Sequence, residues 1–112
     1  MAKKKTQSII TKYTENCMIC GRPNPEIHHC PYGVANHKIA DREGLLFPLC
    51  EDHHRTGKFA AHKCKEVDVL LHIIAQLAWE KHYIAEKQEL PFEGIEDEAR
   101  EQFRKLFGKS YL

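Results

Sequence analysis

The sequence lacks any run of about 18 consecutive apolar residues, which is the length that a transmembrane helix requires. Its first ten residues, MAKKKTQSII, lack an apolar stretch long enough for a signal peptide, so we expect a cytoplasmic protein without a membrane partner. Internal repeats are also missing. With 17 basic and 16 acidic side chains the net charge is only +1, which excludes a strongly cationic, histone-like binder. The 112 residues have the composition of one globular domain.

The charge is small overall but unevenly distributed. Residues 1–63 hold ten Lys or Arg and six Asp or Glu, whereas residues 64–112 hold seven and ten. A basic front half suits a polyanionic partner.

The front half is rich in turn residues and favours short elements. Residues 1–14 are polar and basic, which is typical of a flexible arm. We expect one strand around 26–30, a polar loop over 36–43, and a second strand over 44–50, in which Pro48 indicates a sheet edge or a strand end. A helix is expected to begin at 51–56, because acidic residues in a first turn suit the helix dipole.

The back half favours two helices. The first is expected over about 64–89, ending before Pro91, since its apolar residues recur at helical spacing: Val67, Leu70, Leu71, Ile74, Leu77 and Ala78. The second is expected over about 96–107, with Gly108 as its C-terminal cap.

What the sequence does contain is an unusual number of metal ligands. All five cysteines lie between positions 17 and 64, and six of the eight histidines lie between 28 and 62. Cys17 and Cys20 form a CxxC, and Cys50 and His53 form a CxxH with the same internal spacing. Two such half-sites supply the four ligands of a structural zinc site.

Other interpretations of these cysteines are weaker. A redox CxxC belongs in a βαβ context, which the pattern does not show. A disulfide framework needs an oxidising compartment, and nothing in the sequence suggests export to one. Cys30 and Cys64 remain unassigned, and either could replace His53 as the fourth ligand.

The histidines suggest a second constellation. His28 and His29 are neighbours on the first expected strand, where adjacent side chains face opposite ways, so one suits a ligand and the other a free imidazole. His54 follows the second half-site directly, and His62 follows eight residues later. His37, His72 and His82 are interpreted as ordinary polar residues.

The order of these motifs resembles the HNH family of endonucleases, also called ββα-metal or His-Me finger nucleases. The matching segments, EIHH, GLLFPLCEDHH and the closing FRKLFGKSYL, are similar to those of small phage and prophage members and of Ref-type recombination nucleases. The resemblance covers residues 15–112 and implies one α+β nuclease domain. That domain would have a zinc-stapled ββα-metal core over about 15–63, followed by a helical pair over 64–107.

The resemblance also implies roles for individual residues. His29 matches the general base, and the catalytic divalent ion would be held by His28, His54 and His62. The structural zinc ligands would be Cys17, Cys20, Cys50 and His53.

The chain departs from the family pattern at three places. Leu45 stands where the family has its Asn, for which Asn36 or Asp41 could substitute in holding the loop. Lys58 stands where members often place the third histidine, and His53 replaces the usual cysteine, so that His53 and His54 could exchange roles.

Phosphodiester hydrolysis explains why these residue types would be needed. A neutral imidazole such as that of His29 can take a proton from water near pH 7, and a divalent ion can stabilise the phosphate oxygens. Imidazole ligands accept Mg²⁺, Mn²⁺, Ni²⁺ or Zn²⁺. Phosphate contacts are expected from four basic residues: Arg55, Lys58, Arg42 and Lys38.

The leading hypothesis is therefore a metal-dependent HNH endonuclease that nicks or cuts DNA, binding it through the phosphate backbone. The Ref-like resemblance adds a recombinase or phage protein as a possible partner. Alternatives are a non-catalytic zinc-stapled nucleic-acid-binding or adaptor module, and a protein-interaction domain that uses the acidic helices. The three ligand histidines could also form a second structural site with Cys64 or Cys30.

Overall fold

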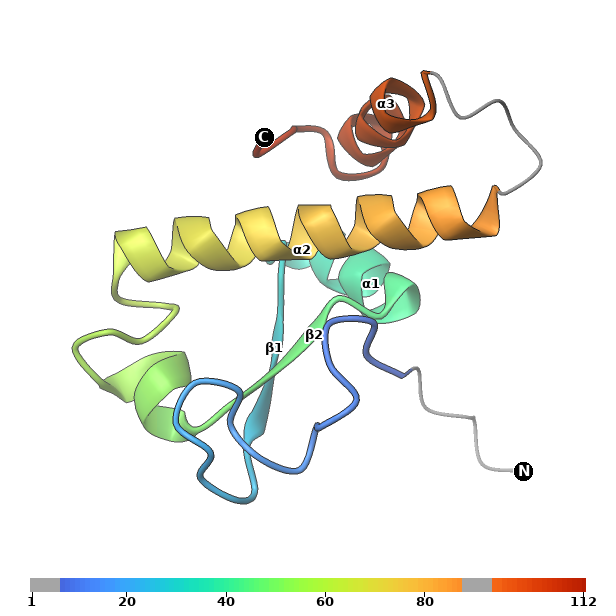
Figure 1. The fold of residues 1–112 in the computed structure, drawn as a ribbon. Helices are drawn as coiled ribbons and strands as arrows, with labels where there is room; N and C mark the ends of the chain where they lie inside the picture. The colour runs from blue at the N-terminus through green and yellow to red at the C-terminus, as the bar shows by residue number, and fades with distance from the viewer. Residues whose placement is uncertain (1–6, 88–93) are drawn as a thin grey trace.

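The computed structural model describes residues 7–87 and 94–112 and shows an α+β fold, as predicted from the sequence (Figure 1). A two-stranded antiparallel sheet is combined with helices and one short π-helical turn. In chain order the elements are β1 (Glu26–His29), α1 (Val34–Glu43), β2 (Leu46–Leu49), η1 (Asp52–Thr56), α2 (Lys65–Glu86) and α3 (Ile95–Phe107). None of the described helices is both long and apolar enough to cross a membrane.

The sheet pairs β1 with β2 so that His28 lies opposite Phe47 and Glu26 lies opposite Leu49. All four β2 residues are buried. Pro48 is tolerated because a strand in a two-stranded sheet has a free edge, where the missing N–H costs no ladder hydrogen bond.

The prediction of a loop over 36–43 is wrong, since these residues belong to α1. The helix buries little more than Ala40, and its other positions are mostly polar, so hydrophobic periodicity gave no helical signal. Gly44 ends the helix with φ 77°, and a Cβ at this position would lie 2.6 Å from the carbonyl oxygen of Gln7. Glycine is therefore required at this turn for both its backbone conformation and its small size.

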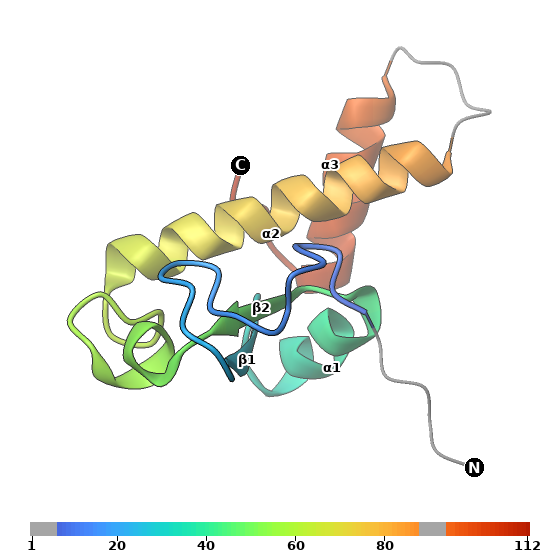
Figure 2. The same ribbon diagram turned by 60° about the horizontal axis from the view of Figure 1, so that its bottom comes forward.

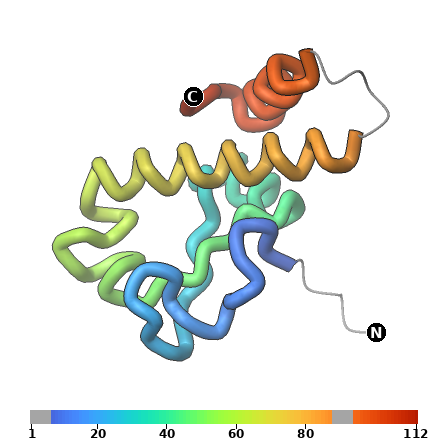
Figure 3. The backbone as a smooth tube through the Cα atoms, in the orientation of Figure 1, coloured from blue at the N-terminus to red at the C-terminus, as the bar shows by residue number. Residues whose placement is uncertain are grey.

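The expected N-terminal arm is only partly described, because residues 1–6 lie outside the described residues. Within 7–14 the chain is not loose. Ser8 Oγ donates a hydrogen bond to the Leu46 carbonyl at 2.6 Å, and the Ile9 N–H donates one to the Gly44 carbonyl at 2.8 Å. The tube in Figure 3 shows this N-terminal segment passing beside the strands.

The two helices of the back half match the sequence prediction closely. The predicted continuation of the first helix over 88–89, and Pro91, lie outside the described residues. Gly108 caps α3 in the left-handed conformation, as expected. Figures 1 and 2 show α2 between α3 on one side and the sheet with α1 on another.

Aromatic side chains hold α2 and α3 together. Phe103 is fully buried, with its ring 5.7 Å from that of Trp79 and 4.6 Å from that of Phe107. Trp79 Nε1 also donates a 2.9 Å hydrogen bond to Glu43, which ties α2 to α1. The helical pair is thereby attached to the part of the fold that carries the cysteines and histidines.

Phe103→Ala is expected to lower the free energy of unfolding by about 3–5 kcal/mol, because it removes a buried ring and leaves a cavity. Urea denaturation followed by circular dichroism measures this change. Phe59→Ala is the matched control, since Phe59 is exposed and its loss should change stability by no more than about 0.5 kcal/mol. Equal effects of the two substitutions would contradict the described core.

Candidate metal centres

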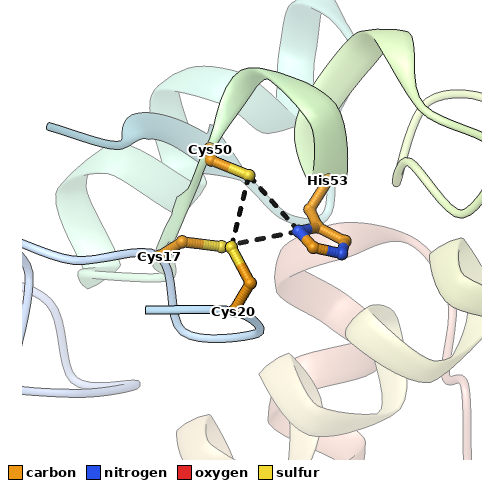
Figure 4. A group of neighbouring side chains, drawn as sticks. All are labelled: Cys17, Cys20, Cys50 and His53. Atoms are coloured by element: carbon orange, nitrogen blue, oxygen red, sulfur yellow. Dashed lines mark hydrogen bonds between the residues drawn. The ribbon is translucent and has the colours of Figure 1, made fainter. Parts of the chain in front are cut away.

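Three cysteines and one histidine meet at the end of the sheet and could hold a metal ion such as zinc: Cys17, Cys20, Cys50 and His53 (Figure 4). Cys20 Sγ lies 3.6 Å from Cys50 Sγ, and Cys50 Sγ lies 3.3 Å from His53 Nδ1. A tetrahedral zinc ion with bonds of about 2.3 Å would separate its sulfurs by roughly 3.8 Å. The observed spacing is thus close to that of a ligand set around one ion.

Local hydrogen bonds shape the first half of this four-ligand cluster. The Cys17 N–H donates to the Arg22 carbonyl, and the Gly21 N–H donates to the Cys17 carbonyl, each at 2.8 Å, which closes a tight turn. Gly21 takes φ 81° in this turn. A further bond from the Met18 N–H to the Pro48 carbonyl attaches the turn to β2, from which Cys50 follows.

The environment of Cys17 favours its thiolate. Burial raises the pKa of this thiol, but hydrogen bonds from backbone groups of Cys50, Cys20 and Ile19 outweigh burial and lower the pKa to about 6. The thiolate is the form of cysteine that binds metals.

The two remaining cysteines lie outside the four-ligand cluster. Cys30 is fully buried, and burial together with the nearby charge of Asp68 raises its pKa. Cys64 Sγ donates a hydrogen bond to Glu66 at 3.4 Å. Of the three candidates for the fourth ligand, the structure brings His53 to the other cysteines.

A second cluster consists of three histidines from three segments: His28 of β1, His54 of η1 and His62 of the loop before α2. Their ring centroids lie 4.8–5.1 Å apart. His54 Nε2 and His62 Nε2 approach to 3.1 Å. We call this set the histidine trio.

An unpartnered atom indicates what the histidine trio could do. His28 is 1% exposed, and its buried Nε2 has no hydrogen-bond partner among the described residues. A buried polar atom without a partner is costly and calls for an explanation, such as an ion. Three imidazoles whose ligand nitrogens lie within 4.8 Å of one another are a suitable donor set for a divalent transition metal.

Burial favours the neutral, metal-binding form of two of these imidazoles, those of His28 and His62. Burial, followed by charge repulsion from His54 and His62, lowers the pKa of His28 to about 3. Burial, followed by repulsion from His54, also lowers the pKa of His62. His28 is therefore neutral at neutral pH, with a lone pair available.

Glu26 orients the histidine trio, although the sequence analysis gave it no role. His54 Nδ1 donates a 2.7 Å hydrogen bond to Glu26 Oε1, which leaves Nε2 of His54 free to face His62. Hydrogen bonds from Arg55 and then from His54 lower the pKa of the Glu26 carboxyl to about 2. A carboxylate behind a ligand histidine is the usual support of a metal site. The signal was available, because Glu26 and His28 are two residues apart on one strand.

Of the four predicted phosphate contacts, Arg55 lies beside the histidine trio, since it shares Glu26 with His54. Arg55 is half exposed, but its Nη2 and Nε donate to the Glu26 carboxylate at 2.6 and 2.9 Å. Lys38 and Arg42 lie on α1, where Arg42 pairs with Glu43 at 3.4 Å. Lys58 Nζ lies 5.6 Å from the ring of its exposed neighbour Phe59.

A cavity of about 240 Å³ adjoins the histidine trio at His62. Its lining includes Tyr32, Lys63, Lys65 and Asp68. The Tyr32 hydroxyl donates to Asp68 at 3.3 Å. Lys63 and Lys65 bring two positive charges to the lining of the cavity. They are closer to the histidine trio in the fold than the sequence analysis recognised.

His29 is separate from the histidine trio. His29 contacts two residues of α1. Its Nε2 donates a 3.1 Å hydrogen bond to Asp41 Oδ1, and its ring packs against that of His37 with centroids 3.8 Å apart. The two residues considered as substitutes for the family Asn have distinct contacts: Asp41 holds His29, and Asn36 Nδ2 donates to the Tyr32 carbonyl at 3.3 Å. Leu45 is fully buried in the core.

The histidines interpreted as ordinary differ among themselves. His37 packs against His29, and His82, which is exposed, pairs with Glu86 at 3.6 Å one turn further along α2. His72 is buried, donates from Nδ1 to the Asp68 carbonyl, and packs on Tyr111. Cys64 and Cys30 are not grouped with the histidine trio in the described part of the chain, so it has three ligands and no fourth from these cysteines.

Cys17→Ala is expected to lose zinc and to leave the cysteine-rich front half unfolded, because a structural zinc site contributes roughly 10–16 kcal/mol of apparent binding energy. Metal analysis of the purified protein and far-ultraviolet circular dichroism test this. Cys64→Ala is the control that should keep its zinc. Unchanged zinc content in Cys17→Ala would remove Cys17 from the ligand set.

Glu26→Gln is expected to weaken binding of a divalent ion at the histidine trio by about 10–100-fold, because the charged support of His54 is lost. Calorimetric titration of the zinc-loaded protein with Mn²⁺ or Ni²⁺ measures this affinity. Glu101→Gln, an exposed change on α3, should leave the affinity unaltered. If both variants bound the ion like the parent, Glu26 would have no supporting role.

A comparison of the chain with models of known protein families gives no match, and comparisons with curated proteins and with solved structures give none either. The function of this chain therefore has to be inferred from the geometry of its two clusters and of the side chains around them.

Proposed function

We propose that this protein is a metal-dependent endonuclease of the HNH type, which hydrolyses phosphodiester bonds of DNA. The observation that carries this proposal is the contrast between the two clusters. One offers four ligands, as closed structural zinc sites do, whereas the histidine trio offers three. Three protein ligands leave a coordination position open, which is the property of a catalytic site.

The chain order of the elements supports the same proposal. A strand with two histidines, a connection, a second strand and a helical turn with two more histidines form a unit in which β1 and η1 supply two members of the histidine trio, His28 and His54. In this proposal the unit is a ββα-metal core stapled by zinc, and α2 and α3 cover it.

Each part of the site has a role in the proposed reaction. His28, His54 and His62 would hold a divalent ion, which would supply the positive charge that stabilises the phosphate during hydrolysis. Lys63 and Lys65, beside the cavity at His62, attract the DNA backbone, so binding weakens as salt is raised. The expected products carry a 5′-phosphate and a 3′-hydroxyl, as the resemblance implies.

His29 is the proposed general base. Because its Nε2–H donates to Asp41, Nδ1 is the nitrogen left to accept a proton from water. Asp41 also stabilises the imidazolium that forms. The scissile phosphate must then lie across the end of β1, where His28 and His29 leave the strand on opposite faces.

The second candidate is a zinc-stapled nucleic-acid-binding or adaptor module without catalysis. Two observations favour it: His29 faces α1 instead of the histidine trio, and the core residue Leu45 occupies the position of the family Asn. Such a module would bind DNA and leave it intact.

A plasmid nicking assay distinguishes the two candidates. Supercoiled DNA incubated with zinc-loaded protein and Mg²⁺ or Mn²⁺ should be nicked, and EDTA should stop the reaction. His29→Ala should lower the nicking rate by about 10²–10⁴-fold, the usual contribution of a general base, with zinc content and helicity unchanged. His82→Ala, an exposed histidine on α2, is the control that should nick normally.

The outcomes separate cleanly. Absence of nicking by folded, zinc-loaded protein that still binds DNA would favour the binding module. Nicking that survives His29→Ala would keep the nuclease but remove His29 from its mechanism.

A further inference from the structure

The outward face of α2 carries an apolar stripe that lies outside the core formed by residues 7–87 and 94–112. Val69, Leu70 and Leu77 are 45%, 55% and 51% exposed, and Ile73 and Ile84 are half-buried. None of the five belongs to the core cluster or to the side chains packed against it in the described part of the chain. At about 100° per residue they share one side of the helix, opposite the buried Leu71 and Ala75.

The stripe has the spacing of a helix–helix seam. Leu70, Ile73, Leu77 and Ile84 are separated by three, four and seven residues and occupy a and d positions of a heptad pattern, whose d position between Leu77 and Ile84 is Glu80, buried against Arg100 of α3. At 1.5 Å per residue the seam is about 21 Å long. Leu70 and Leu77 are exposed at about half of their surface, so another helix can pack on them beside α3, which covers the adjoining side of α2 at Glu80.

Opposite charges at the two ends of the stripe favour a second copy of α2, in the antiparallel direction, as the helix that packs on it. Glu66 lies on the outward face before the stripe, and Lys87 lies on the same side after it. If a second α2 packs antiparallel with Leu77 against Leu77, then Leu70 meets Ile84 and Glu66 of each chain meets Lys87 of the other. A parallel pair would instead place like charges together at both ends.

From this self-complementarity we propose that the protein forms a two-fold symmetric dimer through antiparallel pairing of α2 along the stripe. A two-fold interface requires one patch that is complementary to itself, and the stripe meets this requirement in both apolar contacts and end charges. In this pairing Lys81 of each chain faces Ile73 of the other chain, and the aliphatic part of the lysine side chain can cover the seam. One seam per chain is a small interface, so the dissociation constant is expected in the micromolar range.

This proposal does not depend on the proposed nuclease activity, because α2 contributes no residue to either metal cluster. If both hold, each dimer carries two histidine trios. Loss of dimerisation without loss of nicking, or the reverse, tells the two proposals apart.

Sedimentation equilibrium of the zinc-loaded full chain tests the dimer over a wide range of concentrations. The parent protein should show a reversible monomer–dimer equilibrium. Leu77→Asp should weaken dimerisation by at least 100-fold, because each dimer would bury two charges facing one another. Val34→Asp is the matched control, since Val34 is 95% exposed on α1, away from the stripe, and its change should leave the equilibrium unaltered.

A charge exchange tests the antiparallel direction. Glu66→Lys or Lys87→Glu alone should weaken the dimer about threefold to tenfold, because each places like charges together twice per dimer, and the double variant should restore it. Circular dichroism and zinc content establish that every variant is folded. A folded parent that stays monomeric at all concentrations, or a Leu77→Asp variant that dimerises like the parent, would overturn the proposal; failure of the double variant to restore dimerisation would overturn the antiparallel pairing.

Discussion

The meeting of the two halves of the four-ligand cluster is the constraint on which the candidate site depends. Cys17 and His53, whose side chains approach to 3.8 Å, are 36 positions apart in the chain. Between them lie both strands and α1, so the cluster closes a loop that contains the whole sheet. Two paired strands of four residues are marginally stable in water by themselves. An ion bound by these ligands would supply stability that so small a core lacks.

The π-helical turn η1 connects the two clusters. His53 and His54 are consecutive, so on a helical turn they point to different sides, and one joins the cysteines while the other joins the histidine trio. π-helical turns occur often at functional sites. Because the two histidines share one short piece of backbone, whatever positions His53 also positions His54. Glu26 of β1 then orients the ring of His54 through its hydrogen bond to Nδ1.

The long helix α2 presents three sides that differ in what they contact. Near its N-terminus, Asp68 and His72 contact Tyr32, which lines the cavity beside His62. Its middle packs against α3 through Trp79, and the buried Gln76 accepts a 2.6 Å hydrogen bond from the Tyr111 N–H, so the C-terminal segment also packs on it. A third side carries the apolar stripe. An amphipathic pattern alone does not separate these roles, since apolar residues face the core on one side and solvent on another.

The sequence by itself determined the parts of this protein that depend on local spacing. The CxxC and CxxH spacings predicted which residues form the four-ligand cluster, and helical periodicity with Gly108 predicted α2 and α3, because each half-site and each helix is marked by residues that are close together in the chain. Three further features were decided only by the tertiary structure: α1 forms from a polar segment because Ala40 packs into the core between two glycine turns, Glu26 becomes the support of His54, and His29 pairs with Asp41. Each of these depends on contacts between residues at least twelve positions apart, or on burial by distant elements, and no local pattern records such contacts.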